Sequence, residues 1–212
     1  MPIKIHTYET GPVDTNGYLL YEEETNTSVI IDAPLDMVLK LCSQLSDYNS
    51  FPSALLLTHS HWDHIGDAQK LQLLYPNMKT YIHNLDSYRL IEPMKHTIWE
   101  LPFDIPPVTK FDLIEDGDEL SFGNINLKLM HTPGHTEGSI CFYDNERKIL
   151  FGGDVLFQNS IGRTDLPGGD YDTLINSIKD KLLKLEDKVL VLSGHGDRTT
   201  IGIERESNPF LK

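Results

Sequence analysis

Histidine and aspartate side chains follow the ends of four separate runs that read as strands, and this placement constrains the fold more than any other feature. In open α/β sheets, sites form just beyond the carboxyl ends of the strands. Glycines flank all but the first of these positions and let the backbone turn sharply there. The four are "ALLL" (54–57) before His59, "INLKLM" (125–130) before His135, "KILF" (148–151) before Asp154, and "VLVL" (189–192) before His195.

The remaining pattern predicts one mixed α/β domain over residues 1–212, because no linker or low-complexity segment interrupts it. Pro34 is expected in the first turn of the first helix. Expected strands cover 3–8, 17–22, 28–32, 54–57, 80–83, 111–114, 119–122, 125–130, 139–143, 148–153 and 189–192, and expected helices cover 34–47, 67–75, 85–91 and 172–185.

Residues 92–110 contain four prolines and no periodic pattern, which predicts a long loop. Long loops are often lids or binding edges. Trp99, Leu101 and Phe103 either line a pocket or pin this loop to the core, since aromatic side chains serve both purposes.

Composition excludes several classes of function. The formal net charge is −14 and no basic cluster is present, which argues against a nucleic-acid partner. No run approaches 18 apolar residues, so no membrane-spanning helix is expected, and the first residues lack the apolar region of an export signal. Cys42 and Cys141 do not form a disulfide framework and are expected as reduced thiols in a cytoplasmic protein.

The hexapeptide "HSHWDH" (59–64) indicates a metal site more strongly than any isolated histidine does. Residues i and i+2 of an extended loop project to the same side, so His59 and His61 can share one ion. Asp63 and His64 can then reach another ion. Taken singly, a histidine or aspartate elsewhere more often has a structural use.

The order of the motifs resembles that of the metallo-β-lactamase-fold hydrolases, and within them the glyoxalase II (hydroxyacylglutathione hydrolase) branch. The resemblance is carried by "HSHWDH" (59–64), "HTPGHTEGS" (131–139), "GGD" (152–154) and "SGHG" (193–196), and it covers about residues 3–200. It implies a four-layer αβ/βα sandwich, in which two mixed sheets pack together with helices outside.

The resemblance also implies two divalent metal ions, Zn or Fe, with Mn as a further option. A hydroxide shared by the two ions would be the nucleophile, positioned by Asp63 and Asp154. Seven side chains carry over as ligands: His59, His61 and His135 for the first ion, Asp63, His64 and His195 for the second, and Asp154 bridging both.

A small-molecule thioester such as S-lactoylglutathione suits this chemistry. Its thiolate has a pKa of about 8.5 and departs without a general acid, whereas an amide nitrogen needs a proton. The segments 160–174 and 201–210 resemble those of the short bacterial glyoxalase II-like proteins, which lack the C-terminal helical extension. Within the first segment, Arg163 is either an anion clamp for a substrate carboxylate or the partner of an acid such as Asp165.

Three alternatives stay open. One is a persulfide dioxygenase, in which His59 or a neighbour, with His135 and Asp154, would hold a single iron with open positions for O₂. Another is a lactonase, phosphodiesterase or other ester hydrolase of the same fold. The third is a metal-binding module without turnover. The sequence leaves the metal, the physiological substrate and the oligomeric state undecided.

Overall fold

A computed structural model describes residues 3–212. The chain forms two compact units, one made of Met1–Ile114 with Ser121–Ile125, the other of Glu115–Leu120 with Asn126–Lys212. The single domain over 1–212 stays a prediction.

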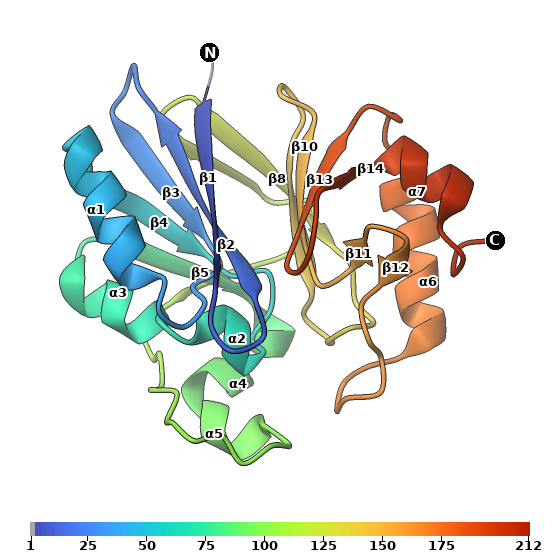
Figure 1. Cartoon of the computed structure of the whole chain (residues 1–212), viewed down its shortest axis with the longest axis horizontal. Helices are drawn as coiled ribbons and strands as arrows, with labels where there is room; N and C mark the ends of the chain where they lie inside the picture. The colour runs from blue at the N-terminus through green and yellow to red at the C-terminus, as the bar shows by residue number, and fades with distance from the viewer. Residues whose placement is uncertain (1–2) are drawn as a thin grey trace. The chain divides into compact units, whose positions relative to one another are not determined.

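The first unit is built on a six-stranded mixed sheet, seen in blue to green in Figure 1. The first three strands pair antiparallel, and the last four pair parallel from β3 onward. Parallel neighbours need crossover connections, which helices supply here. In order, the strands are β1 (Ile3–Thr10), β2 (Thr15–Glu22), β3 (Thr27–Ile31), β4 (Pro52–Leu56), β5 (Lys79–His83) and β6 (Asp112–Ile114).

Helices α1 (Val38–Tyr48) and α3 (Ala68–Leu74) cover this sheet, because each carries apolar residues at helical spacing. Leu41, Leu45 and Leu71 are fully or almost fully buried and belong to the same core cluster as Ile30 and Leu55 of the strands. The remaining short helices of this unit are α2 (Trp62–Ile65), the 3-10 turn η1 (Asn84–Asp86), α4 (Ser87–Ile91) and α5 (Pro93–His96).

The predicted first helix is wrong at its start. The helix begins at Val38, so Pro34 lies before it rather than in its first turn. Asp36 adopts a left-handed backbone with φ of 66°, which interrupts any helix that starts at Pro34.

The second sheet has the strand order β14-β13-β10-β9-β8-β7. Helix α6 (Tyr171–Asp180) buries Leu174 and Ile178 in one core cluster with Leu150 and Val191 of the strands. The predicted helix over 172–185 is divided, because η2 (Leu182–Lys184) follows α6 as a separate turn. The strands are β7 (Glu119–Phe122), β8 (Ile125–His131), β9 (Ile140–Asp144), β10 (Ile149–Gly153), β13 (Leu190–Ser193) and β14 (Thr199–Thr200).

Several short elements were not predicted, because two to seven residues give no readable period. They include the small hairpin of β11 (Leu156–Phe157) and β12 (Ser160–Ile161), as well as α2, α5, β14 and α7 (Ile201–Ser207). Among residues 3–212, none of the helices has the length and apolar character needed to cross a membrane.

The long loop predicted at 92–110 contains α5 and is otherwise irregular. Leu101 and Phe103 are partly buried against the core of the first unit, whereas Trp99 is 43% exposed. Leu101 and Phe103 therefore pin the loop to the core of the first unit.

Candidate metal centre

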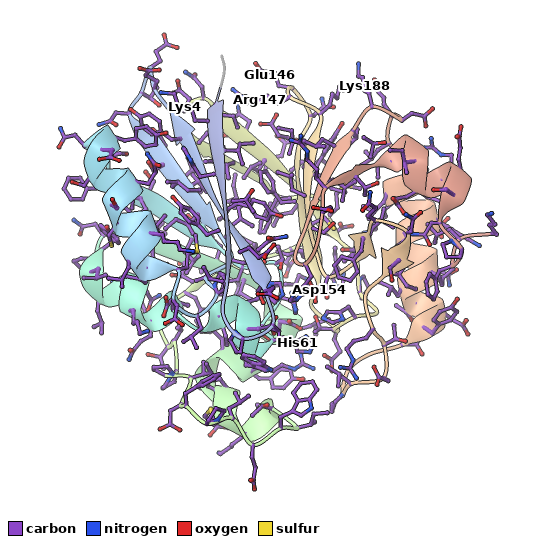
Figure 2. The ribbon with its side chains drawn as sticks, viewed as in Figure 1. Lys4, His61, Glu146, Arg147, Asp154 and Lys188 are labelled. Carbon is purple, nitrogen blue, oxygen red and sulfur yellow. The ribbon has the colours of Figure 1, made fainter. Side chains whose placement is uncertain are left out.

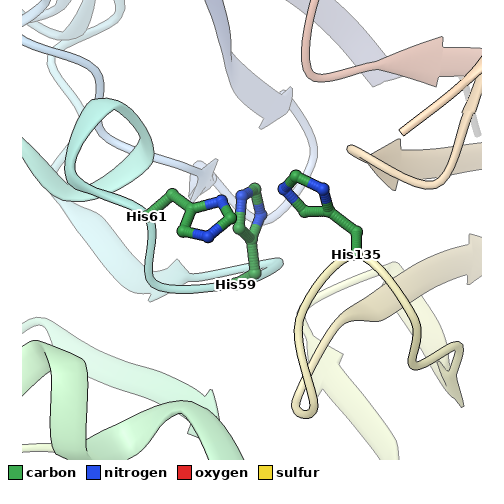
Figure 3. Close-up of side chains that lie close together, drawn as sticks. All are labelled: His59, His61 and His135. Carbon is green, nitrogen blue, oxygen red and sulfur yellow. The ribbon is translucent and has the colours of Figure 1, made fainter. Parts of the chain in front are cut away.

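The histidine loop follows β4 and changes character midway. His61 is extended (φ −63°, ψ 147°), and α2 begins at the next residue. Asp63 and His64 therefore lie on a helical turn, and the extended-loop argument applies to His59 and His61 alone. His59 and His61 do lie together, with ring centroids 4.8 Å apart (Figure 3).

Asp32, the residue that follows β3, fixes the ring of His64. Its buried carboxylate accepts hydrogen bonds from the backbone N–H and the hydroxyl of Thr58, at 2.8 and 2.7 Å. His64 Nδ1 lies 2.8 Å from the same carboxylate. Because an ionised carboxylate only accepts, Nδ1 carries the proton and the lone pair of the neutral ring is on Nε2. Nε2 is then the atom suited to a metal.

The same carboxylate acts on His59 through Thr58. The hydroxyl of Thr58 gives its single proton to Asp32, so it accepts from His59 Nδ1 at 3.1 Å. His59 therefore also has its lone pair on Nε2. One buried aspartate sets the tautomers of two candidate ligands.

Asp63 is held from β2. Thr15, fully buried at the start of that strand, donates a 2.8 Å hydrogen bond to Asp63 Oδ2. The same oxygen lies 3.4 Å from His64 Nε2. Asp63 Oδ2 and His64 Nε2 are thus two potential ligand atoms that lie close enough to contact the same ion.

In the second unit, sheet register brings Asp154 and His195 together. Strands β10 and β13 are parallel, with Gly153 opposite Ser193, so both side chains follow paired strand ends. Figure 2 marks Asp154 at this place. Asp154 Oδ2 lies 3.5 Å from His195 Nε2 and 3.6 Å from His135 Nε2. Asp154 and His195 therefore lie just after strand ends, where they were expected, and their role as ligands stays a prediction.

His135 is oriented by a backbone carbonyl. Its Nδ1 lies 2.8 Å from the carbonyl oxygen of Arg163, which can only accept. The proton is therefore on Nδ1, and the lone pair of the neutral ring faces Asp154.

These donor sets fit divalent metal ions. Two ligand atoms each about 2.1 Å from a tetrahedral ion lie about 3.4 Å apart. The observed separations, 3.4 Å between Asp63 and His64 and 3.5–3.6 Å around Asp154, match that spacing and are too long for good hydrogen bonds. Imidazole and carboxylate ligands suit Zn, Fe and Mn.

Close backbone packing fixes the segments that carry His135 and Asp154 in the second unit. A Cβ on Gly162 would lie 1.9 Å from the carbonyl oxygen of Asp154 and 3.3 Å from His135 Nδ1. Gly134, with φ of 128°, leaves similarly little room beside Leu174. Only glycine permits these approaches.

The Arg163 guanidinium donates two hydrogen bonds to Asp165, at 2.8 and 2.7 Å. These bonds lower the pKa of Asp165 to about 2. The ion pair of Arg163 with Asp165, one of the two roles considered for this arginine, is therefore present in the structure. Its role as an anion clamp stays a prediction.

The other four histidines, His6, His83, His96 and His131, are expected as structural or surface residues, and His96 is exposed with its ring 4.7 Å from that of Tyr88. His6 Nε2 lies 2.6 Å from the Tyr48 hydroxyl, and His131 Nε2 lies 2.8 Å from the carbonyl oxygen of Glu137. His83 accepts from the backbone of Leu85 within η1.

A profile of the Metallo-beta-lactamase superfamily matches residues 10–195, a span that includes every candidate ligand. The chain belongs to this superfamily. Solved structures agree: that of BLEG-1 B3 metallo-beta-lactamase superposes with a TM-score of 0.90 at 38% identity, covering 98% of this chain and 99% of that one. The metallo-β-lactamase fold expected from the motifs is confirmed.

Among relatives, an uncharacterized protein of Mycobacterium tuberculosis is 41% identical over 97% of this chain and 96% of its own length. Hydroxyacylglutathione hydrolase GloC of Haemophilus influenzae is 38% identical, covering 92% of each chain. The structure of TTHA1623 in a di-iron-bound form has a TM-score of 0.86 at 37% identity, covering 97% of this chain and all of that one.

Sequence reasoning missed the residues that orient the candidate ligands, namely Thr15, Asp32 and Thr58. Asp32 was predicted as the last residue of the strand over 28–32, and the structure places it directly after β3, in the same position relative to a strand as Asp154. The other two residues contact their partners across loops and carry no local signal.

Proposed function

We propose that the chain is a dinuclear metal-dependent hydrolase, a glyoxalase II-like thioesterase that cleaves S-lactoylglutathione or a related 2-hydroxyacyl thioester. The observation that carries this proposal is Asp154 Oδ2, which lies 3.5–3.6 Å from the Nε2 atoms of His195 and His135. A carboxylate oxygen between two imidazoles is suited to bridging two ions.

The proposal assigns the ligands in three groups. The metals are Zn or Fe, with Mn as a further option, and the name of the di-iron-bound relative supports iron. His59, His61 and His135 hold the first ion, Asp63, His64 and His195 hold the second, and Asp154 bridges both.

When bound, such a pair of ions lowers the pKa of water to near neutrality and polarises a carbonyl oxygen. The protein side chains supply the geometry. Asp63 and Asp154 position the attacking water, and Asp32 holds the rings of His59 and His64 with Nε2 presented. Arg163, if released from Asp165, supplies a cation for a substrate carboxylate.

A thioester is favoured over an amide on chemical grounds. A thiolate with a pKa of about 8.5 leaves without protonation, so the site needs no general acid. The name of the GloC relative supports the same substrate class. Because BLEG-1 is named a B3 metallo-beta-lactamase, a β-lactam is the competing substrate that should be tested beside the thioester.

A persulfide dioxygenase is the second candidate. In it, His59 or a neighbour, with His135 and Asp154, would hold a single iron with open positions for O₂, and Asp154 Oδ2 lies 3.6 Å from His135 Nε2. A lactonase or another ester hydrolase would use the same water.

The test is an assay of the purified protein with S-lactoylglutathione in the presence and absence of oxygen, alongside a β-lactam and glutathione persulfide. Thioester cleavage that does not need oxygen supports the proposal. Oxygen uptake with the persulfide supports the dioxygenase. A cytoplasmic location and a small-molecule partner, rather than nucleic acid or membrane, complete the proposal.

A further inference from the structure

We propose that Asp86 is a positioning residue that locks the histidine loop, so that His59 and His61 are held ready for a metal. The proposal rests on the proposed function, because it assumes that these histidines are ligands. It concerns a buried cluster of Ser60, Asp86 and Arg89 that the metal chemistry does not itself use.

Ser60 stands between the two histidines and is bound at three points. Its backbone N–H donates to Asp86 Oδ2 at 2.8 Å. Its hydroxyl donates to the carbonyl oxygen of Asp86 at 2.8 Å and also lies 3.0 Å from Oδ2. Both the main chain and the side chain of Ser60 are therefore fixed to one residue.

The alternation of side chains along an extended segment explains why Ser60 can be fixed without blocking His59 and His61. Neighbouring side chains point to opposite sides, so Ser60 faces away from the side that His59 and His61 share. Figure 3 shows these two rings on the loop after β4. Fixing Ser60 sets the backbone on each side of it and therefore the separation of the two rings.

Asp86 is itself held rigidly. It is fully buried, and its second oxygen, Oδ1, accepts from Arg89 Nη1 at 3.0 Å. Arg89 is only 3% exposed, and its guanidinium lies over the Tyr88 ring at 4.6 Å. Burying a carboxylate costs free energy unless it is paired, and Arg89 supplies the paired charge. One oxygen thus anchors Asp86 to α4, while the other anchors the histidine loop.

The second unit offers a matched control. Asp144 is buried at the end of β9, pairs with Arg147 three residues later at 2.9 Å, and accepts from the Arg147 backbone N–H at 2.9 Å. Figure 2 shows Arg147 at the opposite end of β10 from Asp154. The pair has the same chemistry as Asp86 with Arg89 and lies at the turn between β9 and β10.

The experiment measures Zn²⁺ binding to metal-free protein by competition with a chromophoric chelator, for the parent, Asp86→Asn, Ser60→Ala and Asp144→Asn. Asp86→Asn is expected to weaken one of the two Zn²⁺ equivalents about 10–100-fold, the usual effect of losing a residue that orients a ligand. Ser60→Ala keeps the backbone N–H that donates to Asp86, so its Zn²⁺ affinity is expected to fall less than that of Asp86→Asn. Asp144→Asn is expected to bind as the parent does, even if its Tm falls.

Circular dichroism and the Tm of each metal-free variant separate folding from metal affinity. If Asp86→Asn does not fold, Ser60→Ala decides: parent-like Zn²⁺ affinity would overturn the inference. Folded Asp86→Asn with parent-like affinity would overturn it as well. A parent that binds no Zn²⁺, Fe²⁺ or Mn²⁺ would instead refute the proposed function.

Discussion

His64 Nδ1 lies 2.8 Å from the carboxylate of Asp32, and the same carboxylate accepts two hydrogen bonds from Thr58. Both groups are buried. A residue at the end of the preceding strand, β3, thereby decides which nitrogen His64 presents. Metal-binding histidines are commonly oriented in this way.

Replacing Asp32 by Asn is expected to weaken metal binding about 10–100-fold, because the carboxylate accepts three hydrogen bonds through two oxygens and the amide puts an NH2 donor in place of one of them, facing the N–H of Thr58 or the donors on the other side. Asn tolerates the left-handed backbone at this position, where φ is 56°, so the change tests the carboxylate rather than the fold. Chelator competition with Zn²⁺ provides the measurement. Unchanged affinity in a folded variant would argue against the orienting role.

Asp63→Ala is expected to lose one of two metal equivalents and most thioesterase activity, because this carboxylate is assigned to the second ion. Thr15→Val provides a graded comparison, since it removes only the 2.8 Å hydrogen bond to Asp63 and keeps a similar shape. Metal content by elemental analysis and the rate of S-lactoylglutathione cleavage are measured together. Full activity of Asp63→Ala would refute a two-metal mechanism.

Gly162→Ala is expected to destabilise the protein by about 1–3 kcal/mol or more and to displace Asp154, because the new methyl group would overlap a backbone oxygen. Gly152→Ala is the control in the same unit. There the added Cβ would make an ordinary contact, 3.5 Å from Val191. Thermal unfolding and metal content of both variants test this. Equal behaviour of the two would contradict the packing argument.

Cys141 is expected to resist alkylation in the folded protein. Burial raises the pKa of its thiol to about 12, and no part of the residue is exposed. Burial favours the neutral thiol in the folded state, whereas the thiol of the unfolded chain ionises above about pH 9. The free energy of unfolding is therefore unaffected by this group below pH 9 and falls as the pH rises toward 12. Mass spectrometry after iodoacetamide treatment at pH 8 should find Cys141 modified only after unfolding. Rapid labelling of the native protein would contradict its burial.

Much of the fold was readable from sequence, because strands β2, β4, β9, β10 and β13 are apolar runs bounded by turn residues. The positions of His135, Asp154 and His195 followed from the same reading, since each stands just after a strand. Both cysteines were expected as thiols, and both are free.

Other features depend on long-range contacts and have no local signature. The pairing of Gly153 with Ser193 places Asp154 beside His195, yet these strands are about forty residues apart in the chain. The bonds from Ser60 to Asp86 likewise join the histidine loop to the 3-10 turn η1, 26 residues further along the chain. The short helix α2 was missed because four residues are too few to show a period.

The most direct test of the account is the metal content of the purified protein, measured together with S-lactoylglutathione hydrolysis under anaerobic conditions. The account predicts about two Zn, Fe or Mn ions per chain and hydrolysis that proceeds without oxygen. One ion per chain, with no thioester cleavage and with oxygen consumed in the presence of glutathione persulfide, would contradict it.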